Sequence, residues 1–138
     1  MPAAKHPAFS RKTKQLTIIC EDRPGTLSRL AKLLGAEDVN IVAMCCAPFG
    51  IQGTVHIVVD NVKRAKSVLD RECISYTEQD VLHVEMKNMP GRLGEFAGEL
   101  AKENINITTA YGSSIKKCKQ ATVIFRVSDL ERAARIRF

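Results

Sequence analysis

A repeat at a spacing of 66 residues constrains this chain more than any other feature of its sequence. Glu-Asp-Arg-Pro-Gly-Thr-Leu at residues 21–27 has a counterpart, Lys-Asn-Met-Pro-Gly-Arg-Leu, at residues 87–93. Over residues 14–41 and 80–107, 9 of 28 aligned positions are identical, where unrelated sequences of ordinary composition share roughly two. One supersecondary unit has therefore been used twice, and in a short chain this determines most of the fold.

The length of 138 residues leaves room for two units of roughly 65 residues. We expect a basic N-terminal arm at residues 1–14, a first unit at 15–79 and a second at 80–138. A unit of this size buries only about 60% of its unfolded surface and is marginal alone. The two units are therefore expected to pack together, and the pair to oligomerise.

The composition narrows the class of protein. Hydrophobic residues make up 45% and charged residues 26%, as in ordinary globular domains. The longest apolar runs fall far short of the ~20 residues that a membrane span needs, and no apolar leader precedes the first unit. The five cysteines form no C-x-x-C pair, which disfavours a disulfide framework or a zinc site. We expect a reduced, cytoplasmic setting.

The net charge of +6 is unevenly distributed. Four of the bases lie in residues 1–14, which contain no acid: Lys5, Arg11, Lys12 and Lys14. Such an arm is either a solvated tail or a weak, salt-sensitive contact for nucleic acid. Folds that read RNA on a sheet stack bases on strand aromatics, and residues 54–59 contain none. The sequence therefore disfavours nucleic acid as a partner.

Hydrophobic periodicity predicts the same element order in both units. In the first unit we expect strands at 15–21, 40–46, 54–59 and 73–76, with amphipathic helices from residue 26 and from residue 62. In the second we expect strands at 81–86, 105–111 and 120–127, with helices from 93 and from 130. This β-α-β-β-α-β order is typical of the ferredoxin-like α+β fold, an antiparallel sheet with helices on one face.

The second unit lacks a predicted final strand, because the sequence stops at Phe138. An edge strand without its neighbour exposes unpaired backbone groups. The strand at 81–86 is therefore expected to be an open edge, or to be covered by another segment or chain.

The repeated turn has the chemistry of a small-ligand site. Gly25 permits close backbone approach, and the helix that begins near Thr26 offers free N–H groups and the positive end of its dipole to a carboxylate. Asp22 can accept from an ammonium group, and the amide of Asn40, expected nearby at the start of the next strand, can donate and accept. Equally, Asp22 and Asn40 can be simple turn and cap residues.

The two motifs resemble the ACT domain, a small regulatory module that binds amino acids. Asp-Arg-Pro-Gly-Thr-Leu at 22–27 with Val-Asn-Ile at 39–41 carries the first resemblance, and Asn-Met-Pro-Gly-Arg-Leu at 88–93 with Ile-Asn-Ile at 105–107 carries the second. The resemblance implies units packed side by side into one antiparallel sheet, paired through their second strands, with ligands near that interface. The implied ligand-binding residues are Asp22, Arg23, Gly25, Thr26, Leu27, Asn40 and Ile41, with Asn88, Met89, Gly91, Arg92, Leu93, Asn106 and Ile107.

No catalytic, metal or cofactor motif accompanies this pattern. The sequence therefore predicts a non-catalytic sensor that binds an amino acid, forms a homodimer and needs no cofactor. The first unit also resembles the regulatory subunit of acetolactate synthase. An alternative is thus a regulatory subunit that acts only on a partner enzyme.

Overall fold

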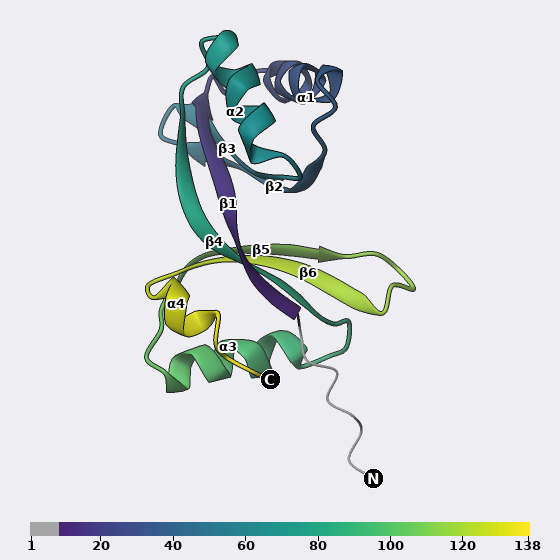
Figure 1. Ribbon diagram of the computed structural model, residues 1–138, viewed down its shortest axis with the longest axis vertical. Helices are drawn as coiled ribbons and strands as arrows, with labels where there is room; N and C mark the ends of the chain where they lie inside the picture. Colours follow the sequence, from purple (N-terminus) through teal and green to yellow (C-terminus); the bar gives the residue numbers. More distant parts are fainter. Residues whose placement is uncertain (1–8) are drawn as a thin grey trace. The chain divides into compact units, whose positions relative to one another are not determined.

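The computed structural model describes residues 9–138 (Figure 1). The elements follow in the order β1 (Phe9–Cys20), α1 (Thr26–Ala36), β2 (Ile41–Phe49), β3 (Gln52–Val59), α2 (Val62–Arg71), β4 (Tyr76–Lys87), α3 (Arg92–Lys102), β5 (Ile107–Ser114), β6 (Gln120–Val127) and α4 (Leu130–Ala133). They form two compact units, which we call the first unit, Lys14–Gln79, and the second unit, Asp80–Phe138 with residues 9–13.

In the first unit, β3 lies between β2 and β1 and is antiparallel to both. Alternate residues of β1, Leu16 and Ile18, point to the face that α1 and α2 cover. There they pack with Leu34 of α1 and Leu69 of α2, all of them at most 1% exposed. The apolar stripes of the two helices are thus buried on one face of the sheet.

The second unit repeats this layout. Strand β6 lies between β5 and β4, again antiparallel to both. The core is built around Phe96 of α3 and Phe125 of β6, whose ring centroids are 5.0 Å apart. The predicted fold class is confirmed: an α+β chain of two ferredoxin-like units with antiparallel strands and helices on one face.

Two strands are longer than predicted. Strand β1 begins at Phe9 rather than at residue 15, so residues 9–14 of the predicted arm belong to a strand; residues 1–8 of the arm lie outside the described residues. The predicted strands at 73–76 and 81–86 are replaced by one continuous strand, β4, which begins at Tyr76. Both errors have one cause, since the polar residues at 10–14 and 77–80 interrupt the apolar alternation from which the strands were predicted.

The polar residues of these stretches have partners in the adjacent strand. In the first unit, Thr17 of β1 donates to Gln79 of β4 across 2.6 Å. In the second unit, Arg11 of β1 lies 3.5 Å from Nδ1 of His83 in β4. Residue 11 contacts residue 83, and residue 17 contacts residue 79. Residue numbers thus rise along β1 while they fall along β4, so the two strands run antiparallel.

The exposed edge expected in the second unit is therefore covered. The two strands β1 and β4 are hydrogen-bonded neighbours, and within the second unit residues 9–13 supply the strand that the repeat lacks. After α4, the described residues contain no further strand. Of the alternatives expected for this edge, open or covered by another segment or chain, the structure shows the covered one, and the covering segment is residues 9–13.

His83 makes this pairing sensitive to pH. Its side chain is 3% exposed, and its Nε2 has no hydrogen-bond partner among residues 9–138. Burial lowers the pKa of His83 from 6.5, and the Arg11 guanidinium lowers it further, against a smaller opposite effect of Glu85. The unfolded chain therefore binds more protons below about pH 6.5, and stability is lost as the pH falls through that range.

We expect the melting temperature of the protein to fall between pH 7.5 and pH 5.5, and to fall less in His83→Gln. Thermal melts of the two proteins at both pH values measure the difference. Equal pH dependence in the two proteins would contradict the assignment to His83.

Candidate functional site

The turn between β1 and α1 ends at position 25, which only glycine suits. Gly25 has φ 93°, a left-handed conformation that strains any L side chain. It is the N-cap of α1, and no side chain caps the helix or places an acid in its first turn. The N-terminus of α1 therefore keeps its positive partial charge free for an external acceptor.

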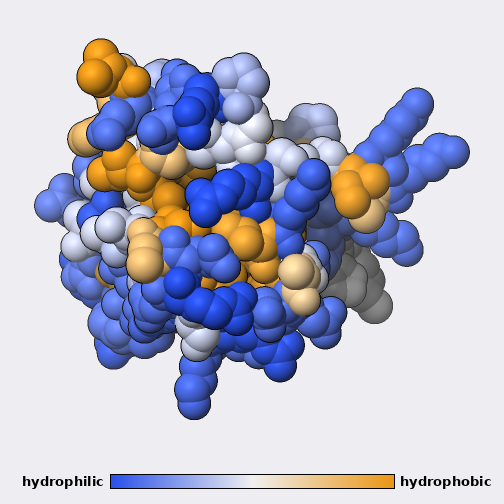
Figure 2. Space-filling view, turned by 90° about the horizontal axis from the view of Figure 1, so that it is seen from above, coloured by the Kyte–Doolittle hydropathy of each residue, from blue (hydrophilic) through white to orange (hydrophobic). Residues whose placement is uncertain are grey.

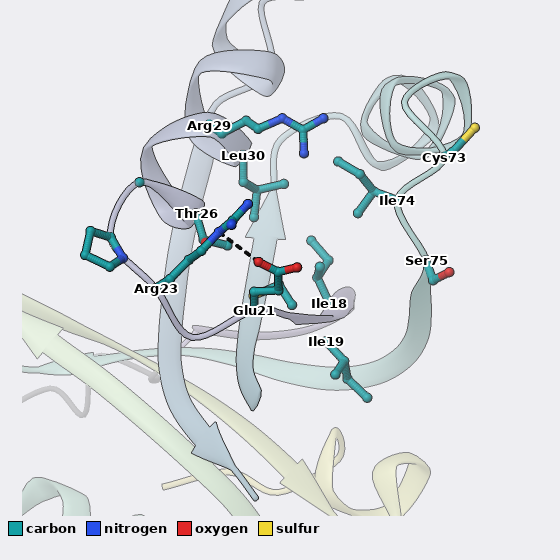
Figure 3. Close-up of a pocket in the computed structure, with 13 residues that line it drawn as sticks. Ile18, Ile19, Glu21, Arg23, Thr26, Arg29, Leu30, Cys73, Ile74 and Ser75 are labelled. Atoms are coloured by element: carbon teal, nitrogen blue, oxygen red, sulfur yellow. Dashed lines mark ion pairs between the residues drawn. The ribbon is translucent and has the colours of Figure 1, made fainter. Parts of the chain in front are cut away.

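A cavity of about 730 Å³ opens beside this turn, entirely within the first unit (Figure 3). Its walls come from the end of β1, the first turns of α1 and the segment after α2. The lining residues are Ile18, Ile19, Cys20, Glu21, Arg23, Pro24, Gly25, Thr26, Arg29, Leu30, Cys73, Ile74 and Ser75. Figure 2 shows patches of apolar surface between hydrophilic side chains.

The rim of the cavity carries two cations and one anion. Glu21 and Arg23 form an ion pair of 2.8 Å, with both side chains largely exposed. The Arg29 side chain extends from α1 toward the segment of Ile74 (Figure 3), and has no hydrogen bond or ion pair to the rest of the described chain. The rim thus has one positive charge without a partner, which suits a carboxylate.

The floor of the cavity is apolar. Ile18 is 1% and Leu30 5% exposed, and Ile74 packs half-buried against the same core. A turn after α2 positions Ile74: Cys73 is left-handed with φ 55°, and the amide of Ile74 donates to the carbonyl of Leu69 at 2.9 Å. This is the Schellman arrangement, which directs the residue after the left-handed position back onto its helix.

The residues of the Pro-Gly motif form only part of the lining of this cavity. Of the predicted residues, Arg23, Gly25 and Thr26 line it, whereas Asp22 and Leu27 do not. The segment 73–75 was interpreted as a strand, because Cys73 stands at a left-handed position where glycine or asparagine is the usual signal.

Asn40 lies at the opposite end of the first unit from the turn. Its backbone exchanges hydrogen bonds with Asp60. Ile41 pairs with Val59, whereas Cys20 pairs with Gly53, and six residues of strand span about 20 Å. The expectation that Asn40 and Ile41 lie beside the turn of their own unit is wrong: β1 and β2 both run antiparallel to β3, so β2 begins level with the middle of β1, well before the turn at its end.

The second unit has the same arrangement of turn and amide. Gly91 has φ 88° and begins α3 without a side-chain cap. Asn88 is engaged by its own loop, because its side-chain amide donates to the carbonyl of Cys118 at 3.3 Å. Asn106 and Ile107 lie at the far end, where the backbone N–H of Asn106 donates to the hydroxyl of Ser128. Met89 and Leu93 are each 53% exposed.

In the second unit, a side chain occupies the position that corresponds to the cavity of the first unit. The ring of Phe138 packs on Phe96 with centroids 4.5 Å apart, and Arg92 lies over the same ring, 5.6 Å from its centroid. By the 66-residue offset, Phe96 and Arg92 are the counterparts of Leu30 and Thr26, which line the cavity of the first unit. Arg92 also pairs with Glu95. By the same offset, Glu95 is the counterpart of Arg29.

The described residues show no sign of a metal site, a membrane-spanning helix or a reactive cysteine. They contain no group of His, Cys, Asp and Glu that could hold a metal ion, and no helix among them is long and apolar enough to cross a membrane. Burial and the charge of Asp22 raise the pKa of Cys20, and burial with the neighbouring Cys45 and Cys20 raises that of Cys46. Raised values keep thiols protonated, in contrast to reactive cysteines.

Two ferredoxin-like units in tandem, each with a Pro-Gly turn before its first helix, define a small paired module. The chain belongs to the ACT domain pair family, whose model matches residues 12–137. ACT domains are regulatory modules, and the resemblance inferred from the two motifs is thereby confirmed.

Solved structures share this layout. Protein BT0572 from Bacteroides thetaiotaomicron has a TM-score of 0.83 at 26% identity, over 90% of this chain and 85% of that chain. The ligand-free regulatory subunit of aspartate kinase from Thermus thermophilus has a TM-score of 0.71 at 16% identity, over 94% and 93%. At the lower identity the likeness concerns the fold alone. No curated protein gives a significant match.

Proposed function

We propose that this protein is a non-catalytic regulatory sensor that binds an amino acid in the cavity beside the β1–α1 turn of the first unit. The observation that supports the proposal is the unpaired Arg29 at a cavity that also borders the uncapped start of α1. Both features attract a carboxylate. Glu21 lies on the same rim, where it pairs with Arg23. Its carboxylate can instead accept a hydrogen bond from the ammonium group of a ligand.

Titration calorimetry with each of the twenty amino acids tests this function. We expect saturable binding of at least one of them by the unmodified protein. No heat and no thermal shift with any amino acid would refute amino-acid binding.

The role of Arg29 can be tested with one substitution. Arg29→Ala is expected to weaken binding by roughly 10- to 100-fold, because hydrogen bonds to charged groups contribute about 1.5–3 kcal/mol. Arg126→Ala is a matched control, since Arg126 is an exposed arginine in the second unit. Calorimetry with the best ligand measures both proteins, and equal affinities would place the carboxylate elsewhere.

We further propose that the protein is a homodimer joined through β2. Strand β2 has a partner on one side only, β3, among the described residues. It presents Val42 and Met44, each 41% exposed, at an edge that a second copy can extend. Asn40 lies directly before this strand, so it would reach a ligand only in another unit.

Met44→Lys places a charge on this edge and is expected to convert the dimer into a monomer. Light scattering coupled to gel filtration measures the mass of each protein, with Lys63→Ala, an exposed position on α2, as the control. A dimer that persists in Met44→Lys would move the interface away from β2.

The alternative is that the chain acts as the regulatory subunit of an amino-acid biosynthetic enzyme. In its favour, the aspartate kinase regulatory subunits from Thermus thermophilus and Thermus flavus match over 93% and 92% of their own chains, so a protein of this extent can serve as a separate subunit. The two functions differ in their requirement for a partner: a sensor responds to its ligand alone. Affinity capture from native lysate with and without amino acids distinguishes them.

A further inference from the structure

The repeat allows the empty cavity of one unit to be compared with its filled counterpart in the other. Residues Leu30 and Thr26 in the first unit correspond to Phe96 and Arg92 in the second. In the first unit they border the cavity, whereas in the second they contact the ring of Phe138. The side chain of Phe138 thus shows what kind of group packs at the position that corresponds to the cavity of the first unit.

That group is an apolar side chain. Phe138 is half-buried and packs with the core of the second unit, against Phe96 on one side and the guanidinium of Arg92 on another. The charges nearby are neutralised, because Arg92 pairs with Glu95. At this place in the second unit the ring of Phe138 is therefore present, and the guanidinium of Arg92 already pairs with a carboxylate.

The first unit offers the same apolar surroundings without an occupant. Ile18, Leu30 and Ile74 form the floor, and the charged groups Glu21, Arg23 and Arg29 lie at the rim (Figure 3). A ligand whose charged groups meet the rim would place its side chain on the floor. The side chains of Ile18, Leu30 and Ile74 carry no hydrogen-bonding group, so a polar side chain resting on them would lose hydrogen bonds to water. The hydroxyl groups of the lining belong to Thr26 and Ser75.

We infer that the ligand is an α-amino acid with an apolar side chain, and that each chain binds one such molecule, in the first unit only. This inference rests on the amino-acid-binding function proposed above and adds the class of side chain and the stoichiometry. Arg29 and the start of α1 bind the carboxylate, and the floor binds the alkyl or aromatic group.

A homologous series of amino acids tests the inference. Alanine, 2-aminobutyrate, norvaline and norleucine share the same charged groups and add one methylene at each step. A buried methylene raises affinity about fourfold, so we expect the dissociation constant, measured by calorimetry on the full chain, to fall two- to fivefold per step. We also expect one site per chain. Serine and aspartate should bind more weakly than norvaline.

Two variants connect these affinities to the cavity. Ile74→Ala removes part of the floor and should reduce the gain per methylene, whereas alanine itself should bind nearly as before. Phe138→Ala empties the place in the second unit and should leave the gain unchanged. Melting curves establish that both variants are folded.

The outcomes are separable. An affinity that does not change along the series, tightest binding of a polar amino acid, or two sites per chain overturns the inference, although the proposed amino-acid binding then stands. An unchanged gain per methylene in folded Ile74→Ala also overturns it, since the side chain then lies elsewhere. Absence of binding by every amino acid overturns the proposed function and this inference with it.

Discussion

Replacing Phe96 by alanine is expected to destabilise the second unit by about 3–5 kcal/mol, the range for a buried phenylalanine. Phe96 is 0% exposed and contacts the rings of both Phe125 and Phe138, at 5.0 and 4.5 Å between centroids. Its loss leaves a cavity between helix and sheet that neither remaining ring can fill without moving. Urea denaturation followed by circular dichroism measures the change.

The control for this prediction is Phe49→Ala. Phe49 is 59% exposed at the end of β2, so its removal is expected to change the free energy of unfolding by less than about 0.5 kcal/mol. A loss below about 1 kcal/mol in Phe96→Ala would show that the aromatic cluster does not stabilise the second unit.

Deletion of residues 1–13 is the second change with a large expected effect. It removes residues 9–13, the strand that covers the edge of β4 in the second unit. Backbone hydrogen bonds contribute about 0.5–1.5 kcal/mol each, so losing those of a five-residue segment is expected to cost several kcal/mol. Hydrogen exchange should show lost amide protection in residues 80–87, and the exposed edge should promote association.

Side-chain loss must be separated from strand loss in this experiment. The double variant Arg11→Ala, Lys12→Ala keeps the strand but removes the contact to His83 and the 2.8 Å ion pair to Glu131. Because the ion pair is exposed, the double variant should retain protection in residues 80–87 and most of the stability. Unchanged protection after the deletion itself would mean that residues 9–13 do not hold this edge.

The repeat was sufficient to predict the order of the elements in both units. Apolar residues that recur at helical or strand spacing, such as Leu30 and Leu34 of α1, correspond to buried positions in the structure, because burial of one face is what creates the pattern. The left-handed glycines Gly25 and Gly91 were likewise predictable from the Pro-Gly turns, since only glycine adopts this conformation without strain.

What could not be predicted depends on partners distant in sequence. Arg11 and Lys12 resembled a solvated tail, yet their partners His83 and Glu131 lie 72 and 119 residues away. The floor residue Ile74 is positioned by a left-handed cysteine, for which the local sequence carries no ordinary signal. The place of Asn40 depends on the direction of β2 relative to β1, which a motif spacing does not encode.

The use of residues 9–13 by the second unit has a consequence for the order of events during synthesis. These residues leave the ribosome before their partner strand, which ends at Lys87. At roughly 5–20 residues per second, the segment waits several seconds with unpaired backbone groups. Positive charge discourages unpaired strands from joining others. The bases at Arg11, Lys12 and Lys14 thus protect a strand whose partner has not yet been made.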